Sequence, residues 1–203
     1  MRSVYIANSH LFINGKLALK GENPIFVKYL KEVYKYKELK YPKYFKMDPL
    51  SKLGFLCAEV LLKEEKLPEQ PERIGIVLEN KVSTYLVDFK HQETINDKSQ
   101  YFPSPANFVY TLPNVMTGEI CIRNGFKGEN MVFVNERFSP EFVAQYITAL
   151  YKADKADFII GGFVDADDED YEGFMFVSRR EDWKEECQEA IEKEYNILKQ
   201  KIN

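Results

Sequence analysis

Residues 128–162 read GENMVFVNERFSPEFVAQYITALYKADKADFIIGG, and this stretch decides the fold class. Two short apolar runs, at 131–134 and 158–160, flank a segment whose apolar residues recur at helical spacing. Ser139 and Pro140 stand where a helix-capping hydroxyl and a first-turn proline are expected. The stretch therefore predicts a strand, a sharp turn, a helix and a second strand, in that order.

The turn between strand and helix is a place where enzymes often carry a nucleophile, because helix N–H groups stabilise an anion there. This turn carries Arg137 and has no cysteine or histidine near it. Ser139 is the nearest hydroxyl, and it is more simply explained as the helix cap than as an acyl acceptor. The residues alone do not provide a nucleophile at this turn.

Outside this stretch, strands and helices are predicted to alternate. Apolar runs predict strands at 4–7, 73–79, 157–160 and 174–178, and helical periodicity predicts helices at 24–36, 48–65, 83–95 and 181–201. We also predict a turn at 101–108, and one or two helices over 105–122 with Pro113 inside. Alternation of this kind indicates an α/β fold with a mixed, mainly parallel sheet covered by helices on both faces.

Composition limits the kind of protein. The chain has 203 residues, 45% of them hydrophobic, with a formal charge of −4. That length suits one domain with a sizeable core, and the charge argues against nucleic-acid binding. No apolar run is long enough for a membrane span, and the N-terminus does not resemble a signal peptide. We therefore expect a cytoplasmic protein.

The usual chemical motifs are lacking. Cys57, Cys121 and Cys187 are far apart and odd in number, which fits neither a disulfide framework nor a Cys-x-x-Cys metal site. His10 and His91 have no evident nucleophile to activate. GFKGEN lacks the lysine of a phosphate loop, and the acidic run DADDEDYE lacks the glycine of a calcium loop. We predict no cofactor and no metal, and a solvated acidic loop.

Four segments together resemble the N-terminal half of a β-ketoacyl synthase, which has the thiolase-like fold. They are YPKYFKMDPLSKLGFLCAEVLL (41–62), RIGIVLEN (73–80), PSPANFVYTLPNVMTGEICIRNGFKGEN (103–130) and KADKADFIIGGFVDA (152–166). The chain is most similar to short proteins of the 3-oxoacyl-ACP synthase N-terminal-domain-like group. The resemblance covers about residues 1–165, and 166–203 add a strand and a terminal helix. We expect residues 1–203 to form a single domain with a thiolase-like half-fold.

The resemblance places the family's nucleophilic cysteine at Arg137, and no cysteine stands within two residues of it. It also implies that the chain, about half as long as a full synthase, lacks the half that bears two catalytic histidines. A non-catalytic protein is therefore expected. Arg137 would form an ion pair with Glu136 or Glu141, or fill the space of an acyl chain, and we favour this structural role over an anion site. Relocated chemistry at Ser139, or at the thiols of Cys57 and Cys121, is the alternative.

The resemblance also implies partners. Full synthases dimerise through the strand before the catalytic helix, which here comprises Met131, Val132, Phe133 and Val134. The partner would be a second copy or a full ketosynthase, as when chain length factors pair with synthases in polyketide and aryl-polyene systems. The lysine-rich segment 28–52 is either a solvated face or a docking site for an acidic acyl carrier protein. An acyl-chain or carrier-binding module is thus the alternative function.

Overall fold

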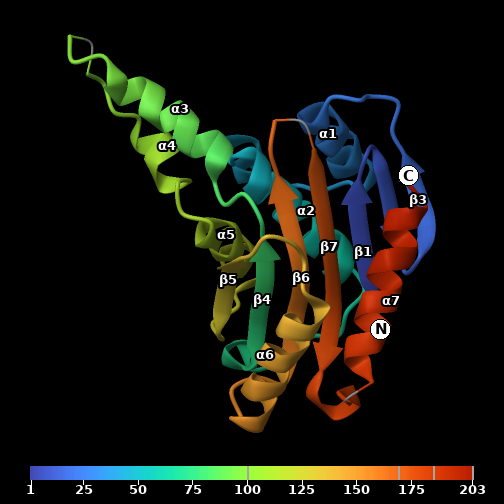
Figure 1. Cartoon of the computed structure of the whole chain (residues 1–203). Coiled ribbons are helices and arrows are strands. Elements are labelled where there is room, and N and C mark those ends of the chain that lie inside the picture. Colours follow the sequence, from blue (N-terminus) through green and yellow to red (C-terminus); the bar gives the residue numbers. More distant parts are fainter. Residues whose placement is uncertain (100, 169, 185, 203) are drawn as a thin grey trace.

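The computed structural model describes residues 1–99, 101–168, 170–184 and 186–202. One seven-stranded sheet forms the centre of this described part (Figure 1). In sheet order the strands are β3 (Lys16–Lys20), β2 (His10–Ile13), β1 (Ser3–Ala7), β7 (Tyr171–Arg179), β6 (Phe158–Ala166), β4 (Ile74–Asn80) and β5 (Asn130–Val134). The strand of the opening sequence stretch, β5, therefore lies at one edge of the sheet.

The sheet is mixed, as predicted, but it is not mainly parallel. Only β4 pairs in parallel with its two neighbours, β5 and β6. The other four neighbouring pairs in the sheet are antiparallel. Only the expected predominance of parallel pairs was wrong. Strand β7 follows β6 after a short turn and the N-terminal strands form a meander, and short connections force antiparallel pairing.

Strands β2 and β3 were missed by the sequence analysis, which predicted only the first strand of this meander. The turns at Asn8–Ser9 and Asn14–Gly15 have positive φ at all four residues, which suits two-residue hairpins. Asn-Gly between apolar runs is a known hairpin signal, so the second turn was readable from the sequence.

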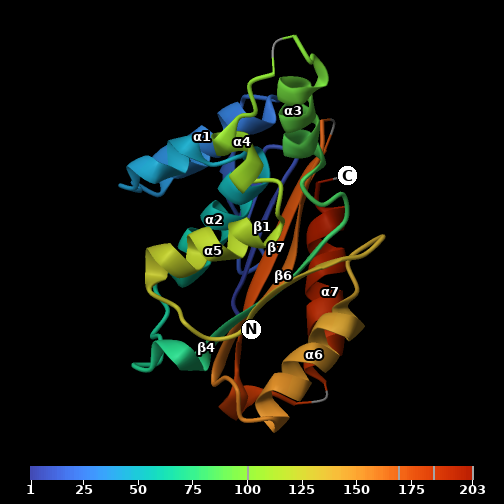
Figure 2. The ribbon, with the colours of Figure 1, turned by 90° about the vertical axis from the view of Figure 1, so that its left-hand side faces the viewer.

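Helices cover both faces of the sheet, which confirms that part of the prediction (Figure 2). On one face lie α1 (Phe26–Tyr36), α2 (Pro49–Leu62) and α5 (Asn114–Asn124). On the other lie α6 (Pro140–Lys152) and α7 (Cys187–Gln200). Each layer encloses its own apolar core, one around α2 and one between α6, α7 and the sheet. No helix in the described ranges is both long enough and apolar enough to cross a bilayer.

Helix α2 begins where the sequence predicts, at the Asp48–Pro49 pair. The Asp48 carboxylate accepts hydrogen bonds from the backbone N–H of Leu50 (2.9 Å) and Ser51 (3.2 Å). Pro49 occupies the first turn, where its missing N–H costs nothing. Most of the helix is buried between α1, α5 and the sheet, so its apolar residues extend around the whole helix.

Two helices extend away from this body. They are α3 (Tyr85–Asn96) and α4 (Pro105–Val109), and they pack on each other at the upper left of Figure 1. The predicted turn at 101–108 is partly wrong, because Ser104 caps α4 by accepting a hydrogen bond from the N–H of Asn107. Of the two alternatives for 105–122, one helix or two, the structure has two, and α5 begins directly after Pro113.

The remaining elements are three 3-10 turns, η1 (Pro42–Lys46), η2 (Pro71–Arg73) and η3 (Arg180–Asp182). The predicted terminal helix begins later than expected, at α7, because η3 takes up its first residues. The two glycines of FIIGG lie where β6 and β7 approach closely. A Cβ on Gly161 would meet the ring of Phe176, and one on Gly162 would meet the Phe174 backbone.

Candidate functional site

The strand–turn–helix of the opening stretch has the predicted local structure. Ser139 is the N-cap of α6, and its Oγ accepts a hydrogen bond from the backbone N–H of Phe142 at 3.2 Å. Pro140 is in the first turn. The predicted cap is confirmed, and the hydroxyl of Ser139 is therefore engaged with its own helix.

Arg137 points outward from the turn. It is exposed, whereas the next side chain, Phe138, is buried against the rings of Phe163 and Tyr195. In the described part of the chain, Arg137 has no ion pair with Glu136 or Glu141, so the predicted pairing is wrong. The turn faces solvent on this side, which removes the need for a partner because water solvates the guanidinium.

The inner side of the turn is held by Glu79, which the sequence analysis did not single out. Glu79 lies near the end of β4 and is fully buried. Its carboxylate accepts a hydrogen bond from the backbone N–H of Ser139 at 2.6 Å and another from the side-chain amide of Asn135. Burial raises the pKa of Glu79 above its usual value, and these two hydrogen bonds oppose that rise. The Glu79 carboxylate is therefore the hydrogen-bond acceptor for the Ser139 N–H at the start of α6.

A second carboxylate fixes the neighbouring loop. Asp165, near the end of β6, accepts hydrogen bonds from the backbone N–H groups of Lys81 (3.0 Å) and Val82 (2.9 Å). The side-chain amide of Asn80 donates to the same carboxylate and to the carbonyl of Val164. The loop after β4 is thus tied to β6 by a set of hydrogen bonds among buried and half-buried groups.

A third group lies at the start of β7. Glu172 accepts a hydrogen bond from the hydroxyl of Tyr5 at 2.7 Å and one from the Lys199 ammonium at 3.2 Å. Lys199 also donates to the hydroxyl of Tyr195 at 3.1 Å. Burial and the charge of Glu172 raise the pKa of Tyr5 and of Tyr195, so both phenols stay protonated. Helix α7 is therefore held against the sheet by polar as well as apolar contacts.

Asp165 and Glu172, but not Glu79, line one small pocket at this end of the sheet. It has a volume of about 190 Å³, and its lining includes Arg137, Asp165, Glu172, Tyr195 and Lys199. The lining carries five acidic and three basic side chains, with no cysteine or histidine among its described residues. The arrangement can bind polar or charged groups, but it presents no nucleophile for acyl transfer.

The alternative nucleophiles lie elsewhere. Cys57 is fully buried in α2, and Cys121 is partly buried in α5, both on the opposite face of the sheet from α6. Burial raises the pKa of both thiols. The structure therefore does not bring Cys57 or Cys121 to the pocket that Arg137 lines, and it keeps both in the unreactive thiol form.

The two histidines are also separate from this pocket. His10 begins β2 and its Nδ1 lies 2.6 Å from the carbonyl oxygen of Asn8. His91 lies on α3 against the ring of Phe108. In the described ranges no group of three or more His, Cys, Asp or Glu side chains is arranged to hold a metal ion. One residue of the acidic run, Glu169, lies outside the described residues.

The predicted pairing strand, β5, has an open outer edge. Toward β4, the carbonyl of Glu129 accepts from Ile76 N–H and the N–H of Asn135 donates to the carbonyl of Asn80, both at 2.8 Å. Backbone groups alternate in direction along a strand. The N–H and C=O groups of Asn130, Val132 and Val134 must therefore point away from β4.

The side chains of β5 are divided between the two faces. Phe133 packs edge-on against Phe142 and Tyr146 of α6. Val132 packs on the opposite core, around α2. Val134 is 52% exposed at the end of the strand. The backbone edge of β5 and the exposed residues at its two ends, Asn130 and Val134, remain accessible to another chain.

Several solved structures share this fold. One is the ishigamide ketosynthase/chain length factor, with a TM-score of 0.62 and 16% identity over 75% of this chain and 49% of that chain. A second is the ketosynthase ApeO in complex with its chain length factor ApeC from Xenorhabdus doucetiae, with a TM-score of 0.56 and 11% identity over 88% of this chain and 77% of that chain. A third is AntDE:AntF, a type II PKS acyl-carrier protein in complex with its ketosynthase bound to the hexaketide. Its TM-score is 0.55, with 14% identity over 89% of this chain and 63% of that chain.

These matches show the fold: the chain has the thiolase-like fold of ketosynthase and chain length factor structures. This confirms the resemblance seen in the sequence, at the level of the fold. The chain spans about half the length of the first of these structures. Protein-family models and curated proteins give no match.

Proposed function

We propose that this protein is a non-catalytic ketosynthase-like subunit that pairs through β5 with a second copy of itself. Residues 1–203 would act as one domain in fatty-acid or polyketide-type synthesis, of the aryl-polyene kind. A full ketosynthase is the alternative partner to a second copy. The observation that carries the proposal is the open backbone edge of β5, because unpaired strand edges favour association with another strand.

The backbone geometry makes β5 complementary to itself. Antiparallel pairing with Val132 on a two-fold axis sets Val132 opposite its own copy and Asn130 opposite Val134. All three residues turn their N–H and C=O groups to the open edge, so each pair can exchange two hydrogen bonds. A two-fold axis of this kind gives a closed dimer with the same surface on both sides.

The chemistry of the turn supports a non-catalytic role. A reactive thiolate or an oxyanion needs free N–H donors at the start of α6. Here the carboxylate of Glu79 takes up the N–H of Ser139, and a negative charge at that place opposes a second anion. Arg137, at the position that the resemblance assigns to the nucleophile, has no acyl-accepting atom.

A charge exchange at Val132 tests the pairing. Val132→Lys or Val132→Glu places like charges opposite each other in the dimer, which destabilises a strand pair. At about 50 µM, light scattering should give the mass of a dimer for wild type. Each variant alone should have the mass of a monomer, because like charges repel across the interface. An equimolar mixture of the two variants should restore the dimer.

Val132→Thr is the matched control, since it keeps the branched shape and adds no charge. A dimeric Val132→Lys variant, or a monomeric wild type at this concentration, would contradict self-pairing. A separate measurement addresses catalysis: intact-mass spectrometry after incubation with acyl-CoA or acyl-carrier donors should find no adduct. An adduct on Ser139 or Cys121 would instead favour a relocated nucleophile.

A second candidate function is docking of an acyl carrier protein. The observation that favours it is the segment 28–52, whose lysines are exposed or half-exposed on and around α1 and η1. An acidic protein would be attracted to such a face, with an affinity that falls as salt rises. One ketosynthase of this fold is known in complex with its acyl-carrier protein.

A further inference from the structure

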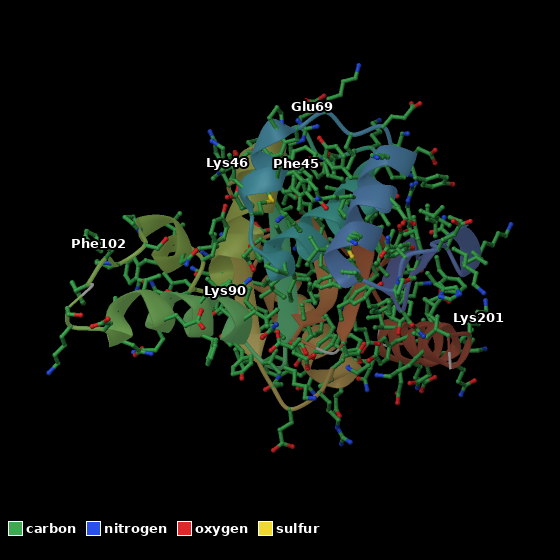
Figure 3. All side chains as sticks on the ribbon, turned by 90° about the horizontal axis from the view of Figure 1, so that it is seen from above. Phe45, Lys46, Glu69, Lys90, Phe102 and Lys201 are labelled. Carbon is green, nitrogen blue, oxygen red and sulfur yellow. The ribbon has the colours of Figure 1, made fainter. Side chains whose placement is uncertain are left out.

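The two-helix arm, defined here as residues 85–112, exposes an unusual amount of apolar surface. Phe102 is 80% exposed, and Figure 3 shows it far from the body of the protein. Its neighbours in the arm with more than half of their surface exposed are Tyr85, Phe89, Tyr101, Phe108, Val109 and Leu112. Exposed apolar side chains that gather in one region mark a contact surface.

The arm also lacks a core of its own. Within α3 only Val87 is buried, and α4 has no buried residue. Hydrogen bonds hold its shape: the hydroxyl of Thr84 donates to the carbonyl of Thr111 at 2.9 Å, and Thr94 accepts from the N–H of Ser104 at 3.3 Å. Short helices without buried apolar contacts are marginal in water, so a covering surface would stabilise the arm.

The position of the arm indicates what covers it. The arm leaves the body next to the end of β4 and extends outward beyond the edge formed by β5 (Figures 1 and 2). A second copy paired at β5 would lie on this side. Three outward-facing residues of β5 alone provide little area, whereas a stable interface buries about 800 Å² per partner. The dimer therefore needs a further apolar contact there, and the arm offers one.

We infer that the arm closes over a second copy of this chain paired at β5 and buries its aromatic side chains against that copy. The inference rests on the proposed function. Two-fold symmetry gives two equivalent arms, one reaching from each copy to the other. The strand pair then sets the register of the dimer, and the arms supply most of its apolar contact.

The test compares an arm variant with a matched control. The arm variant is Phe89→Ser, Phe102→Ser and Phe108→Ser together, and the control is Leu17→Ser with Ile25→Ser. The control residues are 53% and 52% exposed and lie outside the arm, Leu17 on β3 at the opposite edge of the sheet. We expect the dissociation constant of the dimer, from sedimentation equilibrium, to rise at least about tenfold in the arm variant, as for loss of a 1.4 kcal/mol contact. The control should leave it unchanged.

A second measurement keeps the inference falsifiable if the triple variant folds poorly. Benzoylphenylalanine placed at position 102 of the full chain should cross-link two copies under light. Adding Val132→Lys to the same chain should abolish that cross-link. No cross-link from position 102 in a dimeric protein would overturn the inference.

The outcomes separate the two proposals. If the Val132 charge variants break the dimer and the arm variant does not, the arm inference is wrong and the strand pairing stands. If the arm variant breaks the dimer and the Val132 variants do not, the copies associate through the arm alone, and both the pairing at β5 and an arm that closes over a β5-paired copy are wrong. A wild type that stays monomeric at about 50 µM, where a dimer with a micromolar dissociation constant would form, overturns both.

Discussion

Glu79 is the residue on which the candidate site depends most. It lies near the end of the apolar strand β4, is fully buried, and accepts a hydrogen bond from a backbone N–H 60 positions later in the chain. A buried carboxylate is costly unless its oxygens are hydrogen-bonded. The cost is offset here because one carboxylate joins the end of β4 to the start of α6.

At this scale we predict a pH-dependent effect of Glu79→Gln. Burial raises the pKa of Glu79 in the folded protein above its value in the unfolded chain. The carboxyl group therefore lowers the free energy of unfolding progressively as the pH rises from the unfolded pKa through the folded pKa. Glutamine does not ionise. The free energy of unfolding of wild type, relative to the variant, should therefore increase as the pH falls from about 8 to about 4, as measured by urea denaturation.

Glu141→Gln is the control for this series, because Glu141 is exposed in the first turn of α6, the helix whose start Glu79 contacts. Its difference from wild type should not follow the same trend. A Glu79→Gln difference that is constant over the whole pH range would show that the carboxylate has its ordinary pKa.

At the scale of elements, helix caps explain why several boundaries were readable. Asp48 and Ser139 each accept backbone hydrogen bonds at the start of a helix and precede a proline. Such signals are local, because cap and helix are neighbours in sequence. Helix α3, predicted at 83–95 and found at Tyr85–Asn96, was also located to within two residues, although no side chain caps its start.

The cap of α2 gives the prediction at this scale. Asp48→Ala removes the acceptor for two backbone N–H groups and should lower the free energy of unfolding by about 1 kcal/mol. Asp48→Asn keeps an acceptor oxygen and should lie within a few tenths of a kcal/mol of wild type. Thermal and urea denaturation measure both. Equal losses in the two variants would mean that charge, rather than capping, is responsible.

For the whole molecule, the distribution of charge is uneven. Segment 28–52 holds eight lysines against three carboxylates, a charge of +5, so the rest of the chain bears −9 of the total of −4. Figure 3 shows Lys46 and Phe45 projecting from this region. A positive region on an otherwise negative protein orients an acidic partner toward it.

The carrier-docking candidate predicts strong salt dependence. The triple variant Lys28→Glu, Lys31→Glu and Lys35→Glu should abolish binding of a purified acyl carrier protein at about 50 mM NaCl, and wild-type binding should fall at least tenfold at about 300 mM. Lys16→Glu, Lys20→Glu and Lys193→Glu make the same charge change at exposed positions outside the segment. Equal losses in both variants would show an effect of net charge alone. Binding that does not respond to salt would rule the candidate out.

The sequence by itself determined the α/β class, the strand–turn–helix at 128–162, the caps at Asp48 and Ser139, and the absence of a cysteine near Arg137. These features follow from periodicity, capping chemistry and residue identity, all of which act over a few residues. The resemblance to ketosynthases was likewise readable, because its segments occur in order along the chain.

Only the tertiary structure decided the direction of strand pairing, the outward position of Arg137, the contact of Glu79 with α6, and the exposure of the arm. Each depends on segments far apart in sequence: Glu79 meets Ser139, and Tyr5 meets Glu172. A glutamate at the end of an apolar strand was a visible signal, but its partner was not. The reason is physical, since burial and long-range hydrogen bonds exist only once the sheet has assembled.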